Sequence, residues 1–136
     1  MESAATQVAV REIRTLHEAA LVGLRKGDLD SVMAVYADDV ISQPPGQPAR
    51  VGKAAVRSMW EEVLAGFHVQ VHVNILEVHV TGDWAFERGT FEMQLSPKVG
   101  GPSINDTGKY LDVLRQAGGE WRYWRVTWNS SQPPAG

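Results

Sequence analysis

Two carboxylates, Glu87 and Asp112, are the residues of this sequence whose type and position best suit acid–base chemistry. Glu87 has the same parity as Phe91 along one predicted strand, and Asp112 has the same parity as Tyr110 along another. Two carboxyl groups in one apolar pocket would have their pKa values driven apart, leaving one as an acid and the other as a base. The alternative leaves both on the outer face of the sheet or paired with arginines, where they would serve structure alone.

The four histidines do not form a predicted metal site. His68 and His72 share a strand face, but their Cα atoms would lie about 13 Å apart at about 3.3 Å per residue. His79 has the opposite parity, and His17 lies on the first predicted helix. We expect these histidines to be neutral, solvated or at an interface. The chain has no cysteine either, so the sequence predicts no metal ion.

The bulk composition is that of an ordinary globular chain. Its 136 residues match the common size of one domain, and 43% of them are hydrophobic. A formal net charge of −3 gives no support to a nucleic-acid partner. No apolar run approaches the roughly 20 residues that a membrane helix needs, and residues 1–7 lack the pattern of a secretory signal. We therefore expect a cytoplasmic protein that binds neither nucleic acid nor membrane.

A change of hydrophobic period defines the elements that must position these residues. Apolar residues spaced by three and four predict a long helix that ends at Gly27, a short helix after Asp28 and a third helix over 52–65. After Gly66 the period becomes two, which is typical of strands. The predicted strands cover 40–42, 69–75, 84–95, 109–116 and 121–128. Helices followed by an antiparallel meander predict an α+β domain with four to five strands.

Four motifs carry a family resemblance. They are GDLD at 27–30, YADDV at 36–40, VGKAAVR at 51–57 and GKYLDVLR at 108–115, followed by Trp121 and by WNS at 128–130. The sequence resembles the superfamily typified by nuclear transport factor two and ketosteroid isomerase, in its SnoaL-like branch. This resemblance implies a cone-shaped, mainly antiparallel curved sheet packed against three N-terminal helices and enclosing one pocket. It also implies one domain over 7–131, flexible tails over 1–6 and 132–136, and no obligatory cofactor.

The catalytic residues of ketosteroid isomerases do not carry over as a set. By the resemblance, Pro44 stands where their aspartate base lies, and Ala20 stands where their first-helix tyrosine lies. Their protonated aspartate corresponds to Asp112 if the turn that follows is one residue shorter, and to Leu111 otherwise. Their reaction needs both a base and donors to the enolate oxygen, so we do not expect that activity in its familiar form.

Aromatic side chains line the pocket that the resemblance implies. Trp124 and Trp128 share a predicted strand face with Val126, a position where many relatives carry an aspartate. Trp60 lies on the third predicted helix and Tyr36 on the second. Core packing is the alternative for Trp60 and Trp124. The expected pocket residues are Tyr36, Trp60, Phe91, Tyr110, Trp124 and Trp128.

Three functions stay open for such a pocket. The first is a cofactor-independent isomerase, cyclase or lyase that acts on a small apolar carbonyl compound through Asp112 and Glu87. The second is a non-catalytic module that binds a small apolar molecule. The third is a dimerising interaction domain with a filled cavity. A polar strip on the outer face, formed by His68, Gln70, His72 and Asn74, also predicts a homodimer through the sheet, with plain solvent exposure as the alternative.

Overall fold

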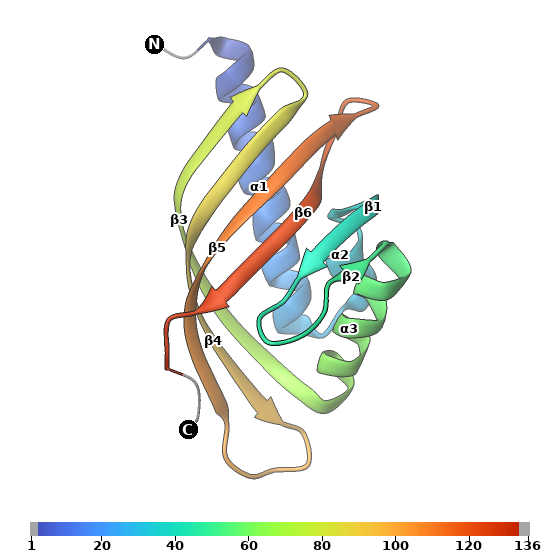
Figure 1. The fold of residues 1–136 in the computed structure, drawn as a ribbon, viewed down its shortest axis with the longest axis vertical. Coiled ribbons are helices and arrows are strands. Elements are labelled where there is room, and N and C mark those ends of the chain that lie inside the picture. The colour runs from blue at the N-terminus through green and yellow to red at the C-terminus, as the bar shows by residue number, and fades with distance from the viewer. Residues whose placement is uncertain (1–2, 134–136) are drawn as a thin grey trace.

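The computed structural model describes residues 3–133 and contains three helices and one six-stranded sheet (Figure 1). The helices are α1 (Ala4–Lys26), α2 (Leu29–Met33) and α3 (Lys53–Gly66). The strands are β1 (Tyr36–Gln43), β2 (Arg50–Val51), β3 (Phe67–Thr81), β4 (Trp84–Pro97), β5 (Ile104–Ala117) and β6 (Glu120–Ser130). The predicted α+β class is confirmed, with helices first and an antiparallel meander after them.

The sheet has the strand order β2-β1-β6-β5-β4-β3. Neighbouring strands are antiparallel except β1 and β6, which run parallel. The sheet has six strands where the sequence predicted four to five. The additional strand is β2, whose pairing with β1 is limited to Ile41↔Val51 and Ser42↔Arg50. A pairing of two residues is too short to produce a visible alternation, which is why the sequence pattern missed it.

A side-chain cap starts α1 and a glycine ends it. Ser3 accepts a hydrogen bond from the backbone N–H of Thr6 at 3.1 Å, so residues 4–6, expected in a tail, form the first turn of α1. Residues 1–2 and 134–136 of the expected tails lie outside the described residues. Gly27 ends α1 with a left-handed φ of 70°. Because α2 ends at Met33, Tyr36 begins β1 and does not belong to the second helix.

The core lies between α1 and the sheet. α1 runs along one face of the strands (Figure 1), and Ile13 packs there against Leu114 and Tyr123. Further along, Leu24 packs with Val32, Leu64 and Val69. No helix within residues 3–133 is long and apolar enough to cross a membrane.

Gly89 allows an aromatic ring to lie across the middle of β4. A Cβ built on Gly89 would meet the backbone oxygen of Asn74 and would come within 2.8 Å of the ring and hydroxyl of Tyr110. Since β4 and β5 pair Gly89 directly with Tyr110, the missing side chain on one strand makes room for the ring of the other.

We predict that Gly89→Ala lowers the free energy of unfolding by about 1–3 kcal/mol, because the added methyl group forces Tyr110 or the backbone to move. Gly66→Ala is the matched control, since a Cβ there meets nothing within 4 Å and alanine favours a helix. Urea unfolding curves measure both effects. Equal stabilities of the two variants would contradict the packing argument.

Candidate functional site

A cavity of about 230 Å³ lies between the helices and the sheet. Its walls are mostly apolar. Those walls come from Leu24 on α1, Met59, Trp60 and Val63 on α3, Val71 and Val73 on β3, Phe91, Met93 and Leu95 on β4, and Val126 and Trp128 on β6. The polar lining consists of His17, Tyr36, Gln47, Tyr110 and Asp112. A few polar groups in a largely apolar cavity are the usual composition of a small-molecule site.

The structure brings most of the predicted pocket residues together. Tyr36, Trp60, Phe91, Tyr110 and Trp128 border the cavity, as does Asp112. Phe91, Tyr110 and Asp112 do so because inward-facing positions alternate along β4 and β5.

Trp124 does not line this cavity, and its predicted position is wrong. The pairing of β5 with β6 shifts register between Val113 and Leu114, which leaves Trp124 without a partner residue on β5. This irregularity breaks the alternation along β6, so Trp124 does not share the face of Val126. Its indole N–H donates to Oδ2 of Asp39 at 3.1 Å, and the guanidinium of Arg125 lies 3.5 Å above its ring.

Asp112 and Glu87 occupy directly opposed positions on β5 and β4. Their exposed fractions are 7% and 0%, so both carboxyl groups face the interior. Leu111, the other residue that the resemblance left open, is 49% exposed and faces away. The register therefore places Asp112 at the cavity.

Glu87 is held by three donors from three different elements. The hydroxyl of Tyr110 donates to Oε2 at 2.5 Å, and the hydroxyl of Tyr123 donates to Oε1 at 2.7 Å. Nδ1 of His17 lies 3.0 Å from Oε2. Burial raises the pKa of Glu87, but the hydrogen bond and electrostatic attraction of His17, with the two tyrosines, outweigh it and leave the pKa lowered. Glu87 is therefore an ionised anchor behind the cavity and does not line it.

The pKa of Asp112 is shifted in the opposite direction. Burial and then the negative charge of Glu87 raise its pKa well above the ordinary value, against a lowering by the backbone N–H of Thr127. That N–H donates to Oδ1 of Asp112 at 3.3 Å. The two carboxyl groups thus have pKa values shifted in opposite directions, and the one that binds its proton more tightly, Asp112, borders the cavity.

His17 is the site residue that the sequence reasoning missed. The expectation of a solvated or interface histidine is wrong here, because its side chain is only 13% exposed and borders the cavity. An ionised Glu87 can only accept, so Nδ1 must carry a hydrogen, and whenever the ring is neutral its lone pair lies on Nε2. Nε2 is buried without a hydrogen-bond partner among residues 3–133. The available signal was the apolar stripe of α1, on which His17 falls one turn after Ile13 and two turns before Leu24.

Tyr36 and Trp60 form a second polar pair at the cavity. The indole N–H of Trp60 donates to the hydroxyl of Tyr36 at 3.1 Å. Burial raises the pKa of Tyr36, so the hydroxyl stays protonated and keeps its own hydrogen to donate. Within the described residues, no group of three or more histidine, aspartate or glutamate side chains could hold a metal ion.

The chain matches the family model of the SnoaL-like domain over residues 17–124. No curated protein matches it at a significant level.

Several solved structures share this fold. A ketosteroid isomerase-like protein from Erwinia carotovora atroseptica is 28% identical, with a TM-score of 0.80 over 90% of this chain and 96% of that chain. A proposed scytalone dehydratase from Novosphingobium aromaticivorans is 18% identical, with a TM-score of 0.85 over 93% of this chain and 86% of that chain. A proposed dehydratase of the nuclear transport factor two-like family from Streptomyces avermitilis is 18% identical, with a TM-score of 0.83 over 93% and 99%.

We predict that Asp112→Asn leaves the protein as stable as the wild type, or more stable, at about pH 7. Because the folded state binds the Asp112 proton more tightly than the unfolded chain does, the wild type loses stability as pH rises from the unfolded pKa of about 3.9 toward the raised folded pKa. The loss is about 1.4 kcal/mol per pH unit in that window, and the variant lacks it.

Urea unfolding of both proteins at about pH 4 and about pH 7 measures this difference. A cost of about 3–5 kcal/mol for the variant at the higher pH would instead identify Asp112 as a buried anion paired with a cation.

Proposed function

This chain belongs to the SnoaL-like domain family, and we propose that it is a cofactor-independent acid–base enzyme of the isomerase or lyase type. The ligand that fits the cavity is a small carbonyl compound with an apolar body. The observation that carries the proposal is that one apolar cavity is lined both by Asp112, whose pKa is raised, and by His17, whose Nε2 is unpaired among the described residues. A buried ring nitrogen without a partner is rare in folded proteins and is a position that a ligand can satisfy.

In the proposed reaction His17 acts as the base and Asp112 as the acid. Nε2 of His17 takes a proton from the carbon next to the carbonyl, and Asp112 gives its proton to the carbonyl oxygen, so a neutral enol forms. Glu87 does not react; it accepts from Nδ1 and stabilises the imidazolium that this step produces. Both transfers avoid a free enolate in an apolar site, where it would be poorly solvated.

The enol can then follow either of two routes. Where the enol is conjugated with a further double bond, His17 returns its proton to the far carbon of that dienol while the enol oxygen gives its proton back to Asp112, and the product is an isomer. Alternatively, a hydroxyl on the next carbon leaves with the His17 proton as water, while the enol gives its proton back to Asp112 and the carbonyl reforms. Both routes return His17 and Asp112 to their starting protonation states. The ketosteroid isomerase-like and proposed dehydratase neighbours are compatible with this reaction class and do not choose between the routes.

Exchange of the methyl protons of acetophenone in heavy water, followed by NMR, tests the proposed chemistry directly. We expect the wild type to accelerate the exchange. Asp112→Asn and His17→Gln should each lower the rate by at least about 100-fold, because each removes one partner of the proton transfer. Gln at position 17 can still donate to Glu87, which preserves the buried network.

His79→Gln is the control for the exchange experiment, since His79 is exposed and lies on β3 away from the cavity lining. Its rate should equal that of the wild type. Binding of acetophenone with no accelerated exchange would move the assignment to the non-catalytic binding module. If acetophenone neither binds nor exchanges its protons faster, the proposal is overturned.

We also propose a homodimer through the outer face of the sheet. The polar strip of β3 is exposed, and on the adjoining strands Phe86 and Leu111 are exposed large apolar residues. Both face away from the helices, because their neighbours Glu87 and Asp112 face inward. An apolar centre beside a polar margin suits a symmetric interface between two copies.

Sedimentation equilibrium at micromolar protein should give twice the chain mass of 15.0 kDa. Leu111→Arg should shift the mass toward that of one chain, because it buries a charge at the centre of the interface. Val99→Arg is the control, since Val99 is 98% exposed in the loop between β4 and β5. A wild-type mass of one chain would exclude the dimer.

A further inference from the structure

The mouth of the cavity carries polar groups that the proposed chemistry does not use. Gln47 is the one exposed residue among the lining residues of the described chain, so it marks the open end of the cavity. It lies between β1 and β2 in a segment that also contains three prolines. Asp112, by contrast, is buried, so the polar lining extends from an exposed side chain to a buried one.

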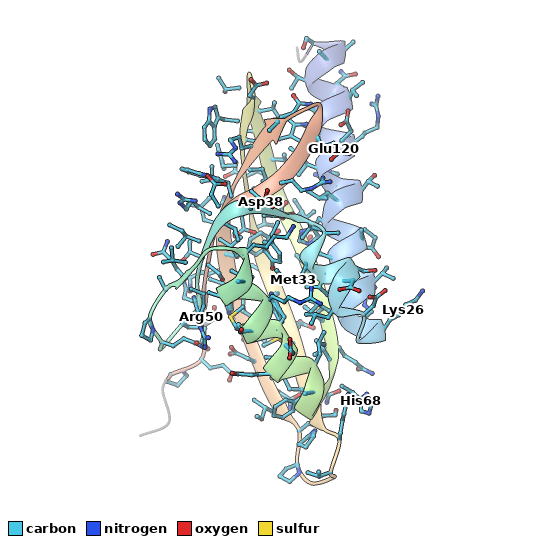
Figure 2. The ribbon with its side chains drawn as sticks, turned by 90° about the vertical axis from the view of Figure 1, so that its right-hand side faces the viewer. Lys26, Met33, Asp38, Arg50, His68 and Glu120 are labelled. Carbon is cyan, nitrogen blue, oxygen red and sulfur yellow. The ribbon has the colours of Figure 1, made fainter. Side chains whose placement is uncertain are left out.

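Arg50 is directed at Gln47. Nη2 of Arg50 donates to Oε1 of Gln47 at 2.9 Å, and Nε donates to the same oxygen at 3.3 Å. Arg50 lies beside α3 (Figure 2), the helix that supplies one wall of the cavity. The guanidinium therefore already directs two donors, Nε and Nη2, at one carbonyl oxygen at the mouth, and the same two donors suit the two oxygens of a carboxylate.

The charge of Arg50 is not neutralised by the described residues. No carboxylate there lies within ion-pair distance of it, whereas the neighbouring Arg57 bonds Oδ1 of Asp30 at 2.8 Å. The Gln47 oxygen is an uncharged acceptor, and a carboxylate in its place would gain the attraction of a full charge. The mouth is therefore the end of the cavity at which an anionic oxygen is favoured.

The buried end has the opposite preference. No lysine or arginine lines the cavity within residues 3–133, and ionised Glu87 lies directly opposite Asp112. A ligand carboxylate there would face a negative charge without a compensating cation, at a high cost in a site of low dielectric. A neutral carbonyl oxygen can instead accept from Asp112.

We propose that Gln47 and Arg50 form a binding subsite for an oxygen-bearing group, best a carboxylate, at the end of the ligand remote from its reacting carbonyl. This inference rests on the proposed function, because it concerns the same carbonyl compound in the same cavity. The substrate class is then a keto acid with an apolar middle. Its two ends differ in charge, so the cavity admits it in one orientation, with the ketone at Asp112 and the carboxylate at Arg50.

Binding of acetophenone and para-acetylbenzoate, measured by tryptophan fluorescence, tests the subsite. The two probes differ by one carboxylate placed opposite the ketone, and Trp60 and Trp128 border the cavity that they would enter. We expect the wild type to bind the carboxylate probe about fivefold more tightly, the upper range for an ion pair open to solvent, and the preference to fall with added salt.

Arg50→Gln should abolish this preference while changing the affinity for acetophenone less than about twofold. Gln47→Glu should abolish it too, because the new carboxylate competes for Arg50. Arg57→Gln, which removes an exposed arginine already paired with Asp30, should retain it.

The results distinguish failure of the subsite alone from failure of both proposals. If the wild type binds both probes and Arg50→Gln leaves the preference unchanged, the subsite is overturned and the proposed function stands. Binding of acetophenone but not of para-acetylbenzoate would also overturn the subsite. If neither probe binds, both proposals fail, because the cavity then does not take small aryl ketones at all.

Discussion

A carboxylate that is removed from water must find hydrogen-bond donors or take up a proton, and Glu87 is fully buried. Its donors come from α1, β5 and β6, while Glu87 itself lies on β4. One helix and three strands therefore have to meet at hydrogen-bonding distance around a single side chain. The packing of α1 on the sheet and the ionisation of Glu87 depend on each other, because loss of a donor would leave a buried charge uncompensated.

The same anion sets the chemistry of the groups that border the cavity. Its charge helps to keep the proton on Asp112, the residue directly opposite on β5. As an acceptor, it determines that Nδ1 of His17 carries a hydrogen, so the lone pair lies on Nε2 whenever the ring is neutral. One buried negative charge thus prepares a proton donor and a proton acceptor at one cavity. The glycine at position 89 belongs to this arrangement, since it makes room for Tyr110, one of the donors.

Local periodicity was enough to predict the α+β class and to place Glu87 with Phe91, and Asp112 with Tyr110, on one strand face each, because alternation along a strand depends on that strand alone. Which face points inward depends on what packs against the sheet, so periodicity left that open. It failed at Trp124, where a register shift between β5 and β6 changes the parity without any change in the types of residue nearby. It failed in a different way at His17. A titratable residue on an apolar helical stripe is a signal in the sequence, but its partner Glu87 is 70 residues away and becomes visible only when β4 packs on α1.

The size of the cavity limits which ligands can use this arrangement. A protein cavity of about 150 Å³ accommodates benzene, and pockets for drug-sized ligands have volumes of about 300 Å³ or more. A volume of about 230 Å³ therefore suits a ligand of one or two rings and is small for a four-ring steroid. Such a ligand gains limited energy from apolar contact, about 25 cal/mol for each Å² buried, and has to offset the loss of its freedom of motion. Polar contacts at the two ends of the cavity are then what would distinguish one small ketone from another, and the charges of Glu87 and Arg50 give those ends opposite preferences.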